Sequence, residues 1–269
     1  ILMTGGLLLN PSYHIPEFTT QGLYLTDKSI FPFLFVTISC GAISGVHASQ
    51  SPIVARCIKT EKDARPVFFG AMVLEGITAL CWAAIAMAFF HSQPQLAAIY
   101  AATPSVAANA MATELLGPIG VVLTIIGIVV CPITSGDTAL RSARITIVDE
   151  FNINNEKIIS RLKLALPLFL ISFGLAFVDF SLIWRYFAVS QLIVATVVLY
   201  AASAYLNNND KPYIVALIPA ILCTLITFGY ILQAPECLGL PSMAANAISV
   251  IATVIVSIIF LKKSKKSIQ

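Results

Sequence analysis

The chain of 269 residues is too apolar for a water-soluble domain, with 58% hydrophobic residues, 11% charged residues and a mean hydropathy of +0.89. Soluble domains carry about 25% charged and about 45–50% apolar residues. The net charge of +3 includes a lysine-rich C-terminal tail. We interpret this tail as an anchor at the membrane surface rather than as a nucleic-acid site.

Seven apolar runs approach the roughly 18–20 residues that cross a hydrocarbon core of about 30 Å. We predict spans at 30–54, 66–90, 117–138, 163–181, 186–206, 213–233 and 243–261. The expected fold class is an all-α, polytopic transmembrane bundle, with 1–29 as an extracytoplasmic segment and 30–269 as the bundle. The chain starts at Ile1 with no signal-peptide pattern, and we expect it to be the C-terminal part of a longer protein.

Basic residues fall almost entirely on one side of these seven spans. Apart from Lys28 and Arg185, every lysine and arginine lies in 55–65, 139–163, 207–212 or the tail from 262. The positive-inside rule places such segments in the cytoplasm. The C-terminus is therefore predicted to be cytoplasmic.

A polar stretch interrupts the first predicted span, from Ser44 to Pro52. Polar or irregular backbone at membrane depth is tolerated only inside protein or beside a wet cavity. We predict substrate-binding residues here, and they are Ser44, His47, Gln50 and Ser51. The alternative is a packing motif formed by Gly41 and Gly45, with His47 as an ordinary hydrogen-bonded residue near the cytoplasmic end.

Glu75 lies near the middle of the second predicted span. A carboxylate there costs at least ~2.5–3.5 kcal/mol unless it is paired, protonated or solvated. Burial also favours its protonated form, which makes it a candidate proton carrier. A structural hydrogen bond to a neighbouring helix is the alternative.

A second interrupted helix is predicted at 131–141, in the third span, around Pro132 and Gly136. Proline frees a carbonyl one turn earlier, and paired interrupted helices mark the substrate and ion sites of secondary transporters. The predicted ligands for a coupling H⁺ or Na⁺ are Thr134, Ser135, Asp137 and Thr138. Alternatively, Asp137 forms ion pairs with Arg141 and Arg144 at the helix end. Arg141 is also a gating candidate.

Asp179 and Arg185 flank a short turn between the fourth and fifth spans, on the predicted outer side. We expect them to pair with each other at the interface, with a role in an outer gate as the alternative. The six cysteines have no CxxC or metal-type spacing, so neither a disulfide framework nor a metal site is expected.

Several long blocks resemble the carbon starvation protein A family. They are FPFLFVTISCGAISG at 31–45, HASQSPIVARC at 47–57, GAMVLEGITA at 70–79, PITSGDTALRSAR at 132–144, DFSLIWRYF at 179–187 and APECLGL at 234–240. The resemblance implies a transporter of the bacterial plasma (inner) membrane with a LeuT/APC-like arrangement and discontinuous helices. It also implies uptake of peptides or pyruvate during nutrient limitation. Gln191 joins the substrate-binding candidates, although no asparagine stands beside it in AVSQLIVA.

These observations predict a secondary transporter of small carboxylates or short peptides, embedded in membrane lipid. A passive channel or a membrane sensor is the alternative. An intramembrane enzyme is disfavoured because HExxH, GxSxG and the P-loop motif are absent. No cofactor beyond the coupling ion and no nucleic-acid partner is expected, and the sequence does not indicate an oligomeric state.

Overall fold

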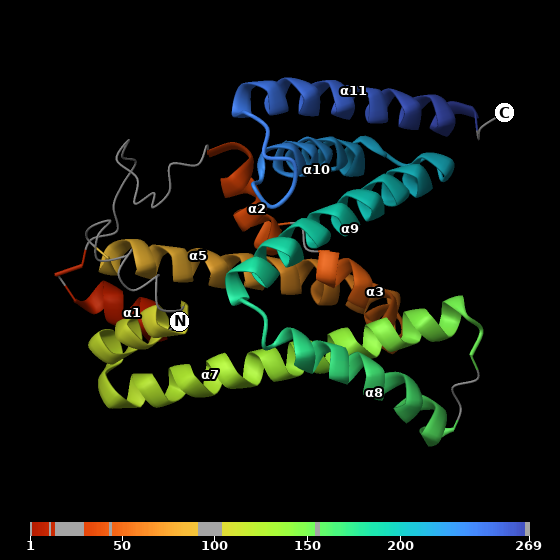
Figure 1. The fold of residues 1–269 in the computed structure, drawn as a ribbon. Coiled ribbons are helices and arrows are strands. Elements are labelled where there is room, and N and C mark those ends of the chain that lie inside the picture. The colour runs from red at the N-terminus through yellow and green to blue at the C-terminus, as the bar shows by residue number, and fades with distance from the viewer. Residues whose placement is uncertain are drawn as a thin grey trace. The chain divides into compact units, whose positions relative to one another are not determined.

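The computed structural model of the chain describes residues 2–10, 12–13, 30–42, 45–90, 104–153 and 157–266 (Figure 1). Every regular element among these residues is a helix. The helices are α1 (Leu2–Leu9), α2 (Ile30–Ala42), α3 (Gly45–Cys57), α4 (Glu61–Ala64), the π-helical η1 (Arg65–Gly70), α5 (Ala71–Phe89), α7 (Pro104–Glu150), α8 (Ile158–Leu175), α9 (Phe180–Asn208), α10 (Ile214–Gln233) and α11 (Ser242–Lys266).

The chain forms two compact units that alternate along the sequence. The first contains residues 1–27 and 58–139, and the second contains residues 28–57 and 140–269. The boundary between them falls inside α7. Each unit is described by itself.

In the first unit, α1 packs against α5 and the beginning of α7. The buried core residues are Met3, Leu7, Ile85, Ala88, Phe90, Met111 and Ala112. Beside this core, the ring of Tyr13 stacks on that of Phe89 with centroids 5.7 Å apart, and the Tyr13 hydroxyl donates to Glu114. Apolar burial therefore holds the short α1 in place.

Helix α7 is broken at Gly117 and not at the predicted position. Gly117 has φ +64°, which favours glycine, and Pro118 then occupies the first position of a new helix, where its missing N–H costs nothing. Helix α7 continues through Pro132, so the predicted interruption at 131–141 is wrong. A proline removes only one backbone donor, and the neighbouring Thr134 hydroxyl donates to the carbonyl of Cys131 at 2.9 Å, which keeps this region bonded to itself.

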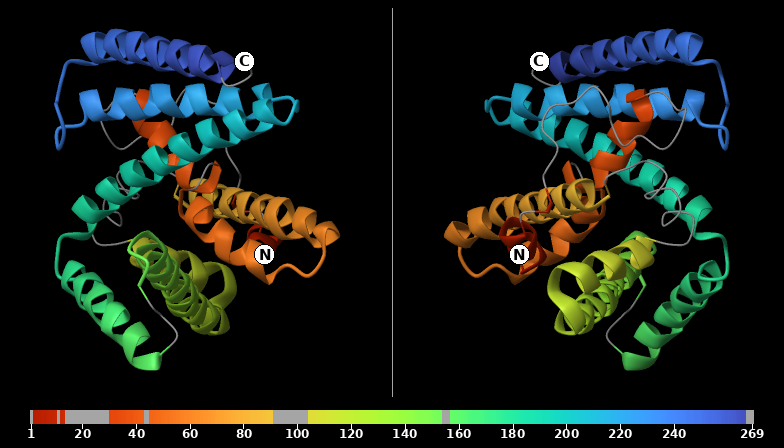
Figure 2. Two further views of the ribbon diagram at one scale, coloured as in Figure 1. Left: turned by 90° about the vertical axis from the view of Figure 1, so that its right-hand side faces the viewer. Right: turned by 90° about the vertical axis from the view of Figure 1, so that its left-hand side faces the viewer.

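In the second unit, α10 packs between α9 and α11, with α2 crossing α9 and α10 (Figure 2). Its core contains Val36, Leu192, Ile226, Tyr230 and Ala234. Buried hydroxyls in α10 and α11 donate to backbone carbonyls of their own helices, as Thr224 does to Ala220 at 2.7 Å. This satisfies the hydroxyl protons at a depth where water is absent.

Six of the described helical segments are long and apolar enough to cross a membrane. They are Glu61–Phe89, Ser105–Glu150, Ile158–Leu175, Leu182–Asn208, Ile214–Gln233 and Ser242–Lys263. Each overlaps one of the predicted spans, which supports a multi-pass membrane protein.

The remaining predicted span, 30–54, corresponds to α2 and α3, which have 13 residues each. Neither is long enough to be a span by itself. Helix α2 ends at Ala42 and α3 begins at Gly45, while Pro52 lies inside α3. The expectation that Pro52 loosens this helix is therefore wrong.

Candidate functional site

The first turn of α3 lies directly against the backbone of α9. A Cβ atom built on Gly45 would lie 3.0 Å from Cα of Gln191 and closer still to its carbonyl oxygen. The backbone N–H of Val46 donates to Oε1 of Gln191. Only a residue without a side chain at position 45 lets the two helices approach this closely.

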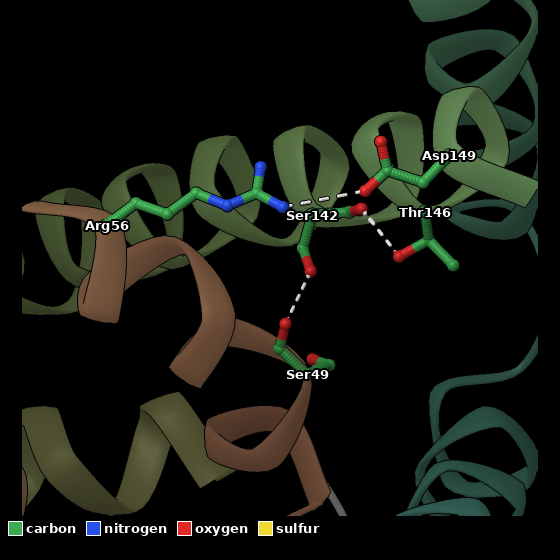
Figure 3. A network of polar contacts seen from close by, with 5 residues as sticks. All are labelled: Ser49, Arg56, Ser142, Thr146 and Asp149. Carbon is green, nitrogen blue, oxygen red and sulfur yellow. Dashed lines mark hydrogen bonds and ion pairs between the residues drawn. The ribbon is translucent and has the colours of Figure 1, made fainter. Parts of the chain in front are cut away.

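The rest of α3 is held by the last three turns of α7 (Figure 3). Ser142 is 6% exposed, and its hydroxyl donates to the carbonyl of Ser49 at 2.8 Å. The carbonyl of Ser142 in turn accepts from Thr146 at 3.0 Å. At the end of α3, Arg56 lies 3.7 Å from Asp149, with both side chains largely exposed. These contacts orient α3 between two helices of the same unit.

The predicted substrate-binding residues that the structure describes come together around this helix. His47, Gln50 and Ser51 are half-buried on α3, and Gln191 is 7% exposed on α9. Ser51 donates its hydroxyl proton to the carbonyl of His47 at 2.7 Å, which leaves its oxygen lone pairs as acceptors. Ser44 lies outside the described residues. The contact between Gln191 and the start of α3 joins two regions that are 145 residues apart.

The predicted coupling residues belong to the first unit. Glu75 is half-buried on α5, whereas Thr134, Ser135 and Asp137 are exposed on α7 and Thr138 is half-buried. The Thr138 hydroxyl donates to the carbonyl of Thr134 at 3.0 Å. No three His, Cys, Asp or Glu side chains in the described part of the chain gather into a metal site. The arrangement leaves a single small cation or a proton as the possible ligand.

A pocket of about 830 Å³ opens within the first unit between α1, α5 and α7. Its lining is mainly aliphatic and includes Trp82, Cys81 and Cys131. Neither Glu75 nor Asp137 lines it. The pocket therefore suits apolar groups and does not serve the predicted coupling residues.

The predicted gating residues contact different partners from those expected. Asp179 caps α9 by accepting from the N–H of Leu182 at 3.1 Å. Nε of Arg185 lies 3.7 Å from Oε1 of Glu236, which also accepts from the Tyr230 hydroxyl at 2.6 Å. The ion pair thus joins α9 to the turn after α10, and the expected pairing of Arg185 with Asp179 is wrong. Arg141 is exposed on α7, in the second unit.

Sequence reasoning did not single out Glu236, Tyr230 or Ser142. Glu236 stands in the APECLGL block, as the first charged residue after the uncharged run of α10. An acid directly after an apolar span was a signal in the sequence, although its partner 51 positions earlier was not. Nothing in the pattern around Ser142 indicated its burial.

The fold and these sites define a multi-pass, all-helical membrane protein with polar residues gathered inside its second unit. A family described as "Carbon starvation protein CstA" matches residues 1–125. An uncharacterized protein of Haemophilus influenzae is 41% identical over 111 residues, which cover 41% of this chain and 80% of that protein. The chain belongs to the carbon starvation protein CstA family. The matched range includes residues 1–29 and the first three of the quoted blocks.

Two relatives have names that describe transport. The pyruvate/proton symporter BtsT of Escherichia coli is 39% identical over 85 residues, which cover 29% of this chain and 12% of the symporter. A peptide transporter CstA of Helicobacter pylori is 49% identical over 85 residues, which cover 30% of this chain and 12% of the transporter. The aligned stretch is thus a small part of each named transporter. No solved structure matches the chain.

Proposed function

We propose that the protein is a secondary active transporter that imports peptides or small carboxylates such as pyruvate across the bacterial plasma membrane during carbon starvation. Membership of a family whose relatives are named peptide transporter and pyruvate/proton symporter is the observation that carries this proposal. The six span-capable helices support it. In this proposal the C-terminus is cytoplasmic, the bundle is LeuT/APC-like, and the protein performs no chemical conversion.

The substrate carboxylate would bind at the start of α3. Backbone N–H groups there point along the positive end of the helix dipole, which favours an anion. Gln191 already accepts from one of these N–H groups and would exchange this bond for one to the substrate. His47, with a reference pKa of about 6.5, can bind the substrate or exchange a proton near neutral pH. Gln50, Ser51 and Ser44 would complete the site.

Coupling to H⁺ or Na⁺ would use the first unit. Glu75 and Asp137 are its carboxylates, and the hydroxyl oxygens of Thr134, Ser135 and Thr138 are hard ligands for a small cation. Breaks at Gly117 and between Ala42 and Gly45 are the discontinuities around which alternating access would occur.

The test is uptake of labelled pyruvate and of a labelled dipeptide by proteoliposomes that contain the full-length gene product, with and without an inward proton gradient. Gradient-dependent, saturable accumulation is expected, and Glu75→Gln or Asp137→Asn should abolish its dependence on the gradient. Glu61→Gln removes an exposed carboxylate from α4 and is the matched control. A requirement for sodium instead of protons would assign the ion role to the hydroxyls of α7.

Other results would contradict parts of the proposal. Equilibration without accumulation would indicate a passive channel, and starvation signalling without uptake would indicate a sensor. Normal uptake by His47→Ala would remove the imidazole from the binding site. Failure to take up either compound would contradict the proposed substrate class.

A further inference from the structure

A charged cluster joins α9, α10 and the turn that follows α10 in the second unit. The Glu236 side chain is 9% exposed, that of Arg185 is 40% exposed, and Tyr230 is 4% exposed. Tyr230 donates to Glu236 at 2.6 Å, while the Arg185–Glu236 contact is 3.7 Å. The acid is therefore held firmly by the tyrosine and loosely by the arginine.

The surroundings of this cluster contain few other charges. Helix α2 contributes the ring of Phe33, whose centroid is 5.5 Å from that of Tyr230. The neighbouring titratable group in the turn is Cys237, and burial together with the charge of Glu236 raises the pKa of its thiol. That thiol is neutral at neutral pH, so Arg185 is the cation that balances the acid.

Arg185 keeps hydrogen-bonding capacity that this cluster does not use. Among the described residues its buried Nε has no hydrogen-bond partner. Its partly exposed guanidinium has five N–H donors arranged to bind a carboxylate with two parallel hydrogen bonds. An incoming carboxylate can therefore form a shorter contact with Arg185 than Glu236 does.

We propose that Arg185 is an outer binding point for the substrate carboxylate and that Glu236 takes up the proton that accompanies it. In this step the guanidinium–Glu236 contact breaks, a guanidinium–substrate contact forms, and one proton moves from water to the carboxylate of Glu236. The net charge of the cluster does not change. A buried carboxylate that has lost its cation is unfavourable, and protonation removes that cost.

This inference rests on the proposed function and adds a binding step to it. Arg185 and Gln191 are six residues apart on α9, or about 9 Å along the helix axis. A carboxylate released by Arg185 would next meet the end of α9 that contacts α3. The proton taken up on binding is assigned to Glu236, in addition to the coupling residues of the first unit.

The test measures binding of pyruvate and of dialanine to the detergent-solubilised, full-length gene product, together with proton uptake from a weakly buffered solution. The wild type should take up one proton per bound anion, so the apparent affinity falls about tenfold per pH unit above the protonation range. Glu236→Gln should bind without proton uptake and with an affinity that does not change with pH. Pyruvamide, which has no carboxylate, should not bind.

Further variants separate this role from a structural ion pair. Arg185→Lys should keep the proton uptake with weaker binding, whereas Arg185→Gln should lose at least about tenfold in affinity. Tyr230→Phe removes a donor to the ionised acid, and should move proton uptake to higher pH. Asp210→Asn changes an exposed turn carboxylate at positive φ, which asparagine tolerates, and should match the wild type.

Unchanged proton uptake in Glu236→Gln would overturn the inference while leaving the proposed function intact. If that variant does not fold, an unchanged pH range in Tyr230→Phe overturns it equally. Absence of both binding and transport in the wild type would instead refute the proposed function, and this inference with it.

Discussion

Gly45→Ala tests whether the close contact between α3 and α9 maintains the candidate site. The new methyl carbon would lie 3.0 Å from Cα of Gln191, and closer to its carbonyl oxygen. Both are backbone atoms of a helix and cannot rotate away. Helix α3 must therefore move, and the bond from Val46 to Gln191 lengthens or breaks.

The expected cost combines two known effects. Overpacking of a well-packed contact costs about 1–3 kcal/mol. Loss of a hydrogen bond adds about 0.5–1.5 kcal/mol. Gly45→Ala should therefore lower the free energy of unfolding by about 2–4 kcal/mol, and it should reduce pyruvate uptake more strongly than its effect on folded protein alone explains.

The assay is unfolding of the purified protein in mixed micelles, followed by circular dichroism, with uptake measured in parallel. Gly76→Ala is the matched control, because a Cβ there meets nothing within 4 Å and alanine favours helix by up to about 1 kcal/mol. If Gly45→Ala is as stable and as active as Gly76→Ala, the contact does not hold the site and our reasoning about α3 is refuted.

Three further predictions concern contacts around the two units. Ser142→Ala should destabilise by about 0.5–1.5 kcal/mol in the same unfolding assay, because it removes a buried hydrogen bond to Ser49; Arg56→Ala, which breaks an exposed ion pair, should cost less than about 1 kcal/mol, and a larger loss for Arg56→Ala would contradict this ranking. Hydrogen bonding to Glu114 raises the pKa of Tyr13 to about 12. Its contribution to stability is therefore complete below pH 10 and is lost as the pH rises through about 12. Glu114→Gln should return this ionisation toward pH 10 in a tyrosinate absorbance titration, and an unchanged titration would refute the assignment.

The spans with uninterrupted apolar runs were predictable within a few residues. Helix α10 was predicted at 213–233 and extends from Ile214 to Gln233. Composition alone defines such a span, because the bilayer requires length and hydrophobicity and little else. The grouping of Gln191 with the residues of α3 came from a family resemblance, since no local pattern connects positions 145 residues apart.

Breaks and ion partners were less predictable. Pro132 seemed a stronger interruption than Gly117, yet a helix tolerates proline when nearby groups bond its backbone, whereas a positive φ ends it. Arg185 was matched to Asp179 because they are close in sequence, but tertiary packing brought Glu236 to it. Such choices depend on which turns meet in space, and that information is absent from local spacing.

The part of α7 after Gly117 is longer than a bilayer is thick. From 118 to 150 the helix extends about 50 Å, and the hydrocarbon core measures about 30 Å. Its apolar residues end near Asp137, so the last three to four turns overhang into the headgroups and water. The contacts that fix α3, from Ser142 and Asp149, belong to this overhang. The polar helix of the candidate site is therefore moored at the membrane surface, and reagents that cannot enter lipid would reach the Arg56 end of α3 before the Gly45 end.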